Sequence, residues 1–286
     1  MSLDYKAKVI TFNGFGPDNY ASTGTSGPDD PAFAKRVLCE GDSWFSIGAV
    51  PSNNLLNPMR FSKSTLLVNL ASPGDTIKNM SEISSNPVLK QLINEKKFLT
   101  KWDAIFLSGG GNYLIDLADQ IICTPSTGAG KHMLDYIDAI ELNNLKARVQ
   151  QGYKKISTLR AGSPNAQTPI VTHVYDYPTP RNAKSKFLGI GVDGPWIYAA
   201  LKTNDIPQEF WISLTDYIFE CLAISIIELK HVIENFHVVS STRGTLIRAS
   251  LGTTGADGDW LNEIHPTGDG YAKLADIIST EFSYIR

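Results

Sequence analysis

The chain has 286 residues, of which 42% are apolar, and a formal net charge of −3. This length and apolar content suffice for one large α/β domain, or two small ones, with a sizeable core. No cluster of Lys and Arg stands out, which argues against nucleic acid as the main partner. We find no apolar run in the sequence that is long enough to span a bilayer.

The N-terminal residues, 1–6, lack the apolar stretch of a signal peptide, so we expect a cytoplasmic rather than a secreted protein. The three cysteines, Cys39, Cys123 and Cys221, are odd in number and lack the spacing of metal ligands. We therefore expect them to be buried thiols in a reducing compartment.

Strand-like and helix-like segments alternate along most of the chain. Residues 1–31 are assigned to an N-terminal arm or loop, because 13–31 are rich in Gly, Pro, Ser, Asp and Asn, and 32–286 to a single domain. Alternation of strands with long helices predicts βαβ units and a mostly parallel sheet. Buried strands are expected at 36–40, 65–70, 104–108, 169–174 and 237–241. Helices are expected at 133–159, 207–235 and 267–283, the last with Thr267 as N-cap.

Two segments are predicted to be long loops, at 123–131 and 177–196. Long loops in compact α/β domains often contribute to a functional site. For residues 177–196, a role in the site and a decoration without chemistry are both open. Asp176, Tyr177 and Arg181 follow the fourth strand and could contact substrate at the same sheet edge.

The first candidate motif is Gly41-Asp42-Ser43, which directly follows the first buried strand. A hydroxyl on a tight turn at the carboxyl end of a strand is well placed to act as a nucleophile. Ligands of open α/β sheets also collect at this edge. The alternative is a Ser that only caps the following turn or helix.

Two further strands end in glycine-containing loops. Gly74 follows the second strand, where its backbone N–H could donate to an oxyanion. The third strand ends in Gly109-Gly110-Gly111-Asn112; its glycines let the backbone approach a ligand, and the Asn112 amide can donate a hydrogen bond. Ordinary turns are the alternative for both loops.

His265 stands just before the last predicted helix, and Pro266 restricts the chain at this point. A general base needs a near-neutral pKa and a fixed geometry, and a histidine held in this way offers both. The alternative is a surface His near a helix N-terminus.

Together these blocks resemble the SGNH (GDSL-type) hydrolases, from about Val37 to the C-terminus. The resemblance implies a flavodoxin-like, three-layer α/β/α sandwich. It implies that Ser43 is the nucleophile and His265 the base, and that the Ser43 N–H, the Gly74 N–H and the Asn112 side chain form the oxyanion hole. No metal or cofactor is implied.

The chain departs from the pattern of this family at two positions. Tyr113 replaces the Asp that usually follows the Asn of the third block, and Asn262 stands where the acid precedes the His by three residues. An Asn carbonyl can orient an imidazole but cannot balance its positive charge. Three readings stay open: a Ser-His-Asn triad, a Ser-His dyad, or an acid supplied by Asp259 or Glu263. We favour Asn262 as the residue that orients His265, followed by Asp259.

Three other patterns are rejected. Residues 189–194 spell Gly-x-Gly-x-x-Gly but lack the strand, helix and acidic residue of a dinucleotide site. Residues 128–132 resemble a phosphate loop, but Pro125 replaces its first Gly and His132 its Ser or Thr. Phe45 replaces the last Gly of Gly-x-Ser-x-Gly, which disfavours an α/β-hydrolase elbow.

The expected function is hydrolysis of a carboxylic ester, as by an esterase, lipase or deacetylase, through an acyl-Ser43 intermediate. The substrate would be a small-molecule, lipid or acylated-sugar ester. The alternative, suggested by Asn262, is a weak or inactive module of the same fold that binds a carbohydrate or acyl ligand. The aromatic residues Trp44, Phe45, Tyr113 and Trp260 flank the blocks in sequence, and we expect core roles for them ahead of substrate contact.

Overall fold

The computed structural model describes residues 2–14, 16–46, 53–82, 84–94, 101–125, 130–186 and 192–285. Its centre is a six-stranded parallel sheet with the order β10-β7-β6-β3-β5-β2. The strands are β2 (Lys8–Thr11), β3 (Lys35–Gly41), β5 (Thr65–Asn69), β6 (Ala104–Ser108), β7 (Ile170–His173) and β10 (Phe236–Val239). Two short antiparallel pairs join β1 (Tyr5–Lys6) to β4 (Arg60–Phe61) and β8 (Ser185–Lys186) to β9 (Val192–Asp193).

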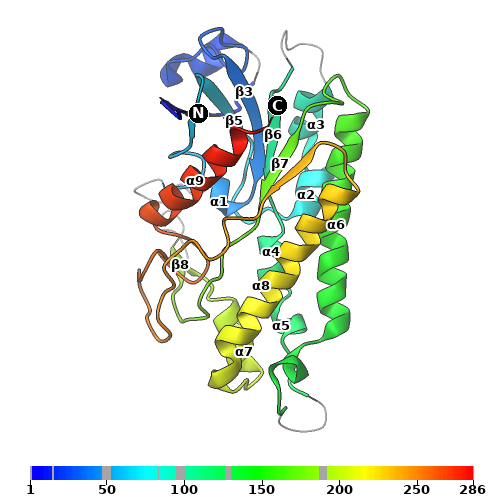
Figure 1. Ribbon diagram of the computed structural model, residues 1–286, viewed down its shortest axis with the longest axis vertical. Coiled ribbons are helices and arrows are strands. Elements are labelled where there is room, and N and C mark those ends of the chain that lie inside the picture. Colours follow the sequence, from blue (N-terminus) through cyan, green and yellow to red (C-terminus); the bar gives the residue numbers. More distant parts are fainter. Residues whose placement is uncertain are drawn as a thin grey trace.

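Helices cover both faces of the sheet. In Figure 1, α9 lies on one side of the strands, and α2, α6 and α8 lie on the other. The helices are α1 (Ser43–Ser46), α2 (Ile77–Ser81), α3 (Pro87–Asn94), α4 (Gly111–Asp116), α5 (Ala118–Ile121), α6 (Ala139–Ala161), α7 (Ile197–Thr203), α8 (Trp211–Ile227) and α9 (Gly268–Phe282). Short 3-10 turns occur at Pro17–Thr23, Met133–Tyr136, Gln208–Phe210 and Glu228–His231.

The strand order confirms the predicted fold class. Without the edge strand β2, the order β5-β3-β6-β7-β10 is 2-1-3-4-5 in chain numbering, which is the flavodoxin-like order. Chain progression reverses between β3 and β6, and ligands of such sheets bind at this switch point. The segments that follow these two strands carry Ser43 and Asn112.

The buried strands form where they were expected, because their continuous apolar runs suit a sheet that is covered on both faces. The structure differs at the N-terminus: Lys8–Thr11 lies within the range assigned to an arm or loop, but pairs in parallel with β5 as the edge strand β2. The helix expected over 133–159 is divided by Asp138, whose carboxylate accepts from Ile140 N (2.8 Å) and Glu141 N (3.0 Å) and caps α6.

The segment around α8 corrects one expectation. Gln208–His231 is long and apolar enough to cross a membrane by length and composition, contrary to the expectation from the sequence. Half of its most apolar 18-residue stretch is buried inside the fold, and the core helix of a soluble protein can have the same length and composition. Thus the segment is weak evidence for a membrane span.

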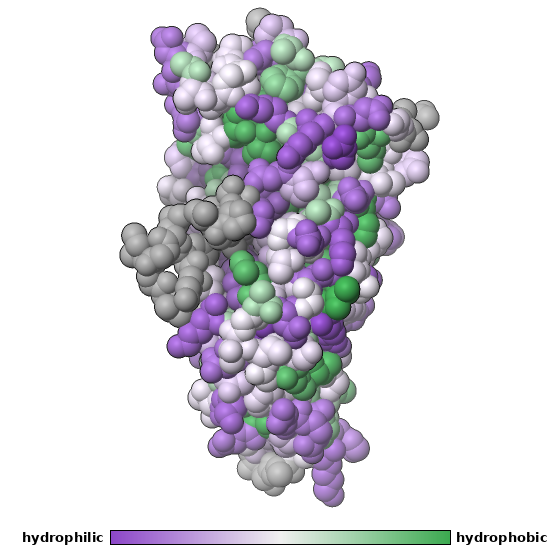
Figure 2. Space-filling model, turned by 90° about the vertical axis from the view of Figure 1, so that its left-hand side faces the viewer, coloured by the Kyte–Doolittle hydropathy of each residue, from purple (hydrophilic) through white to green (hydrophobic). Residues whose placement is uncertain are grey.

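The surface and the thiols fit a folded domain of this kind. The face that carries α9 shows small apolar groups scattered among polar ones (Figure 2), as is usual for a protein surface. Of the three free cysteines, Cys39 is buried, as expected, whereas Cys123 and Cys221 are partly exposed.

Candidate active site

Ser43 begins α1 directly after β3, on a turn that is tightly enclosed. A Cβ on Gly41 would lie 2.9 Å from atoms of Phe45 and Ser108, so only glycine fits there. The Asp42 carboxylate stabilises the turn, because it accepts hydrogen bonds from Trp44 N (3.0 Å) and Ser108 Oγ (2.9 Å). These contacts fix the backbone on both sides of Ser43.

His265 meets Ser43 although the two are 222 residues apart in sequence. Ser43 Oγ lies 2.8 Å from His265 Nε2. His265 ends the loop before α9, and the Thr267 hydroxyl caps that helix by accepting from Gly270 N at 3.1 Å. The N-cap of α9 is thereby fixed two residues beyond His265.

Asn262 contacts the opposite side of the imidazole. Its Oδ1 accepts from Ile264 N (3.1 Å) and His265 N (2.9 Å). Because backbone N–H groups can only donate, these two bonds fix which end of the amide is the oxygen. The same oxygen lies 3.1 Å from His265 Nδ1. Nδ1 must therefore carry the hydrogen, and the Nε2 lone pair faces the Ser43 hydroxyl.

The two other acids considered for this position have different partners. Asp259 Oδ2 lies 2.6 Å from Lys273 Nζ and accepts from Ile247 N at 2.7 Å. Glu263 is fully buried, and its carboxylate accepts from three backbone N–H groups at the start of α7, those of Trp196, Ile197 and Tyr198. Each carboxylate is thus engaged in holding a backbone segment.

Burial sets the ionisation of the site. It lowers the pKa of His265 to about 3, so the imidazole is neutral near pH 7. Burial also raises the pKa of Asp42 to about 6 and that of Glu263 to about 7, against the opposing effect of their hydrogen-bond donors. A neutral imidazole is the form that can accept a proton.

Gly74 and Asn112 line the same cavity as Ser43 and His265, with a volume of about 280 Å³. Gly74 has φ +81°, a left-handed conformation that favours glycine. Asn112 Nδ2 donates to the carbonyl oxygen of Asp75 at 2.7 Å, which ties α4 to the loop that carries Gly74. The structure therefore brings together the four residues that the sequence motifs single out.

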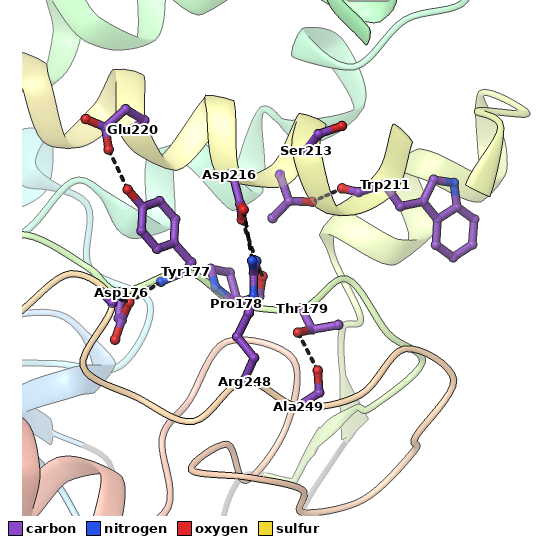
Figure 3. Close-up of polar contacts among 12 residues, drawn as sticks. Asp176, Tyr177, Pro178, Thr179, Trp211, Ser213, Asp216, Glu220, Arg248 and Ala249 are labelled. Carbon is purple, nitrogen blue, oxygen red and sulfur yellow. Dashed lines mark hydrogen bonds and ion pairs between the residues drawn. The ribbon is translucent and has the colours of Figure 1, made fainter. Parts of the chain in front are cut away.

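Three residues expected at this sheet edge have clear structural partners. The buried Arg181 guanidinium donates to the carbonyl oxygens of Asn262 (2.7 Å) and Trp260 (3.2 Å), and so supports the loop before His265. Asp176 lines a second cavity beside Ser43; its carboxylate accepts from the backbone N–H groups of residues 244–246. Tyr177 points toward Glu220 on α8 (Figure 3), with its hydroxyl 2.6 Å from Glu220 Oε2.

The structure also adds residues that the sequence motifs did not single out for the site. Trp196 lines the cavity of His265, with the two ring centroids 6.4 Å apart. Phe219, on α8, lines the second cavity beside Ser43. Trp196 is the last residue of a predicted loop and Phe219 lies in an apolar helix, so no local sequence pattern marked either one as a site residue.

Of the aromatic residues flanking the blocks, Trp44, Phe45 and Trp260 are buried in the core, and Tyr113 is partly buried against it. Trp44 and Trp260 also line the second cavity beside Ser43. The rejected glycine patterns at 128–132 and 189–194 lie partly outside the described residues. Within the described ranges, no group of three or more His, Cys, Asp or Glu side chains is arranged to hold a metal ion.

Comparisons with known proteins add a structural likeness. No protein-family model matches the chain, and no curated protein matches it. A solved structure described as a GDSL-like lipase from Bacteroides ovatus is similar, with 14% identity and a TM-score of 0.46 over 89% of this chain. This chain spans about half, 54%, of that protein.

Two further solved structures are similar over most of both chains. The aryl esterase of M. smegmatis has 12% identity and a TM-score of 0.44, with 88% of this chain and 100% of that one covered. The acetylxylan esterase of Geobacillus stearothermophilus has 13% identity and a TM-score of 0.44, with 88% and 95% covered. At this level of likeness, the function rests on the geometry of the site itself.

Proposed function

We propose that this chain is a serine esterase in which Ser43 is the nucleophile, His265 the general base and Asn262 the residue that orients the imidazole. One observation carries the proposal: a continuous hydrogen-bonded relay runs from Ser43 through His265 to Asn262, at the wall of a cavity that Gly74 and Asn112 also line. A nucleophile, a base and an orienting group within hydrogen-bond reach form the arrangement that activates a serine.

The first half-reaction acylates Ser43. His265 Nε2 takes the hydroxyl proton while Oγ attacks the ester carbonyl carbon, and the carbonyl oxygen becomes an oxyanion. The imidazolium then gives the proton to the leaving alcohol as the carbon–oxygen bond to that alcohol breaks. The Asn262 side-chain carbonyl accepts from Nδ1–H throughout and keeps the imidazole ring in the same orientation.

Three donors are proposed for the oxyanion. They are the backbone N–H groups of Ser43 and Gly74 and the side-chain amide of Asn112. An amide nitrogen carries two hydrogens; one Asn112 N–H is held by the Asp75 carbonyl, which leaves the other for the substrate. Donors that are fixed before the reaction stabilise developing charge at little reorganisation cost.

The second half-reaction releases the acid. Water takes the place of the alcohol, and His265 Nε2 removes a proton from it while its oxygen attacks the acyl-Ser43 carbonyl carbon. The bond between Ser43 Oγ and the acyl carbon then breaks, and the imidazolium returns the proton to Oγ, which regenerates the hydroxyl and frees the acid. Neither half-reaction consumes a redox equivalent.

A non-catalytic module of the same fold is the second candidate, and Asn262 is the observation that favours it. An amide cannot balance the imidazolium formed during acylation, so turnover would be slower than with a carboxylate. Such a module would bind an acyl or carbohydrate ligand at the same cavity without turning it over.

Hydrolysis of p-nitrophenyl acetate separates these candidates. We expect turnover by the wild type and a loss of at least about 1000-fold in kcat in both Ser43→Ala and His265→Ala. His237→Ala, at an exposed position on β10, is the matched histidine control and should retain wild-type turnover. Equal rates in the wild type and Ser43→Ala would exclude the esterase and leave the binding module.

A further inference from the structure

Ser43 lies between two cavities of very different size. The open cavity, which contains Trp196 and His265 in its wall, has a volume of about 280 Å³. A narrow cavity of about 20 Å³ lies on another side of Ser43, and its wall includes the aromatic rings of Trp44, Tyr175, Phe219 and Trp260. Ser43 and Asn112 line both cavities.

The position of His265 assigns a part of the substrate to each cavity. The leaving alcohol must take its proton from the imidazole, and His265 lines the open cavity, not the narrow one. The alcohol therefore belongs to the open cavity. The carbonyl carbon is bonded to Ser43 and its oxygen faces Asn112, both at the boundary, so the remaining substituent, the acyl chain, points into the narrow cavity.

Packing holds the inner wall of the narrow cavity in place. The Trp44 ring stacks on His173 with centroids 5.5 Å apart and meets the Tyr175 ring edge-on at 4.9 Å. Trp44 Nε1 also donates to the carbonyl oxygen of Ile264 at 3.2 Å, and the Tyr175 hydroxyl donates to Asp42. Close-packed, hydrogen-bonded aromatic rings give way little when a ligand is too large.

Hydrogen bonds also hold the opposite wall of the narrow cavity, to which Phe219 contributes. Phe219 sits on α8 between Asp216 and Glu220, and Figure 3 shows both acids bonded to neighbouring loop residues. Arg248 donates to Asp216 (2.8 Å), and Tyr177 donates to Glu220 (2.6 Å). These contacts tie α8 to the loops after β7 and β10, so the helix that carries Phe219 cannot move outward without breaking them.

We propose that the substrate is an acetyl ester, because the narrow cavity accepts a methyl group and excludes longer acyl chains. This inference rests on the esterase activity proposed for Ser43. A cavity needs roughly 10–15 Å³ to hold one water molecule, so about 20 Å³ admits a single group of about that size, such as a methyl. The open cavity places no comparable limit on the alcohol, which can be far bulkier than the acyl group.

A series of p-nitrophenyl esters tests this assignment, because the alcohol stays constant while the acyl chain grows. One misplaced methylene changes kcat/KM by about 10- to 200-fold, so butyrate should react at least about 100-fold more slowly than acetate. Equal kcat/KM for acetate, butyrate and octanoate would overturn the acetyl assignment and leave the esterase proposal intact. Failure of the esterase proposal is recognised separately, by the absence of turnover with every ester.

Enlarging the narrow cavity should relax this selectivity. Phe219→Ala removes one wall, and we expect the butyrate-to-acetate ratio of kcat/KM to rise at least about 10-fold. Leu214→Ala is the matched control, because Leu214 is buried on the same helix but does not line the cavity; its ratio should equal that of the wild type. The ratio is measured within one protein and does not depend on the folded fraction.

Phe219→Leu is a milder second variant if Phe219→Ala does not fold. It too should raise the butyrate-to-acetate ratio, by less than Phe219→Ala. An unchanged ratio in the folded Phe219 variants, or an equal rise in Leu214→Ala, would overturn the assignment of the narrow cavity to the acyl group.

Discussion

The side-chain oxygen of Asn262 accepts from the backbone N–H of His265 at 2.9 Å and lies 3.1 Å from Nδ1 of the same residue. One neutral oxygen thus fixes both the backbone and the tautomer of the proposed base. The orientation of the imidazole is set by geometry, while the charge that a carboxylate would add is missing.

Asn262→Asp should raise the rate of acylation. A carboxylate can accept the same three N–H groups, and a unit charge about 4 Å from the imidazolium contributes up to about 4 kcal/mol at an effective dielectric constant of about 20. Desolvation offsets part of this gain, so we expect a kcat increase of about 10- to 1000-fold. Kinetics with p-nitrophenyl acetate measure it, and a rate at or below that of the wild type would show that charge at this position does not limit catalysis.

Protonation of His265 should not lower kcat/KM until well into the acid range. The reaction needs neutral His265, whose pKa burial lowers to about 3, so protonation removes activity only at low pH. In Asn262→Asp the new negative charge should raise this pKa by about 1–3 units and move the acid limb upward.

Two other groups titrate inside the measured range and must be distinguished from His265. Burial raises the pKa of Asp42 to about 6 and that of Glu263 to about 7. A fall in kcat/KM that is caused by protonation of His265 should move to higher pH in Asn262→Asp. A wild-type limb near the ordinary histidine pKa of about 6.5 that moves in this way would show that burial does not lower the pKa of His265.

Asn112→Ala should lower kcat by about 100- to 1000-fold with a smaller effect on KM, since an oxyanion donor acts mainly on the transition state. The substitution also removes the 2.7 Å bond to the Asp75 carbonyl, so the melting temperature is measured in parallel. Asn144→Ala, on the exposed face of α6, is the matched control. An unchanged kcat in folded Asn112→Ala would remove Asn112 from the oxyanion hole.

Asp259→Asn separates the structural role of this acid from a catalytic one. Although burial raises its pKa, hydrogen bonds from Lys273 and Ile247 hold the pKa of Asp259 below the usual range. Loss of the charge weakens the contact with Lys273, and we expect a fall in the free energy of unfolding of about 1–3 kcal/mol. The kcat of the folded variant should stay close to that of the wild type. Collapse of kcat with an unchanged melting temperature would make Asp259 the acid of the site.

The sequence predicted the buried strands well, because buried parallel strands are continuous apolar runs. The residues that it singled out at the strand ends, Ser43, Gly74 and Asn112, line one cavity, and their roles there stay predictions. The sequence did not reveal β2, because Lys8–Thr11 is short and lies at the sheet edge, next to a stretch rich in loop-forming residues. Predicted helices were too long where a 3-10 turn adjoins an α-helix, because the turn continues the helical pattern in the sequence. Met133–Tyr136, which precedes α6, is an example.

Other features of the site depend on three-dimensional contacts. The meeting of Ser43 with His265 joins segments 222 residues apart, and no local spacing encodes it. The choice among Asn262, Asp259 and Glu263 required their hydrogen-bond partners, because all three precede His265 within six residues. Phe219 belongs to a helix whose apolar residues all fit a core role by pattern alone.

The most direct test of the central claim is intact-mass analysis after treatment with a serine-directed fluorophosphonate. An activated Ser43 predicts one adduct on the wild type, mapped to Ser43, and none on Ser43→Ala. Ser46→Ala, in the same short helix, should be labelled like the wild type. An unlabelled wild type, or equal labelling of the wild type and Ser43→Ala, would contradict the proposal that Ser43 is an activated nucleophile.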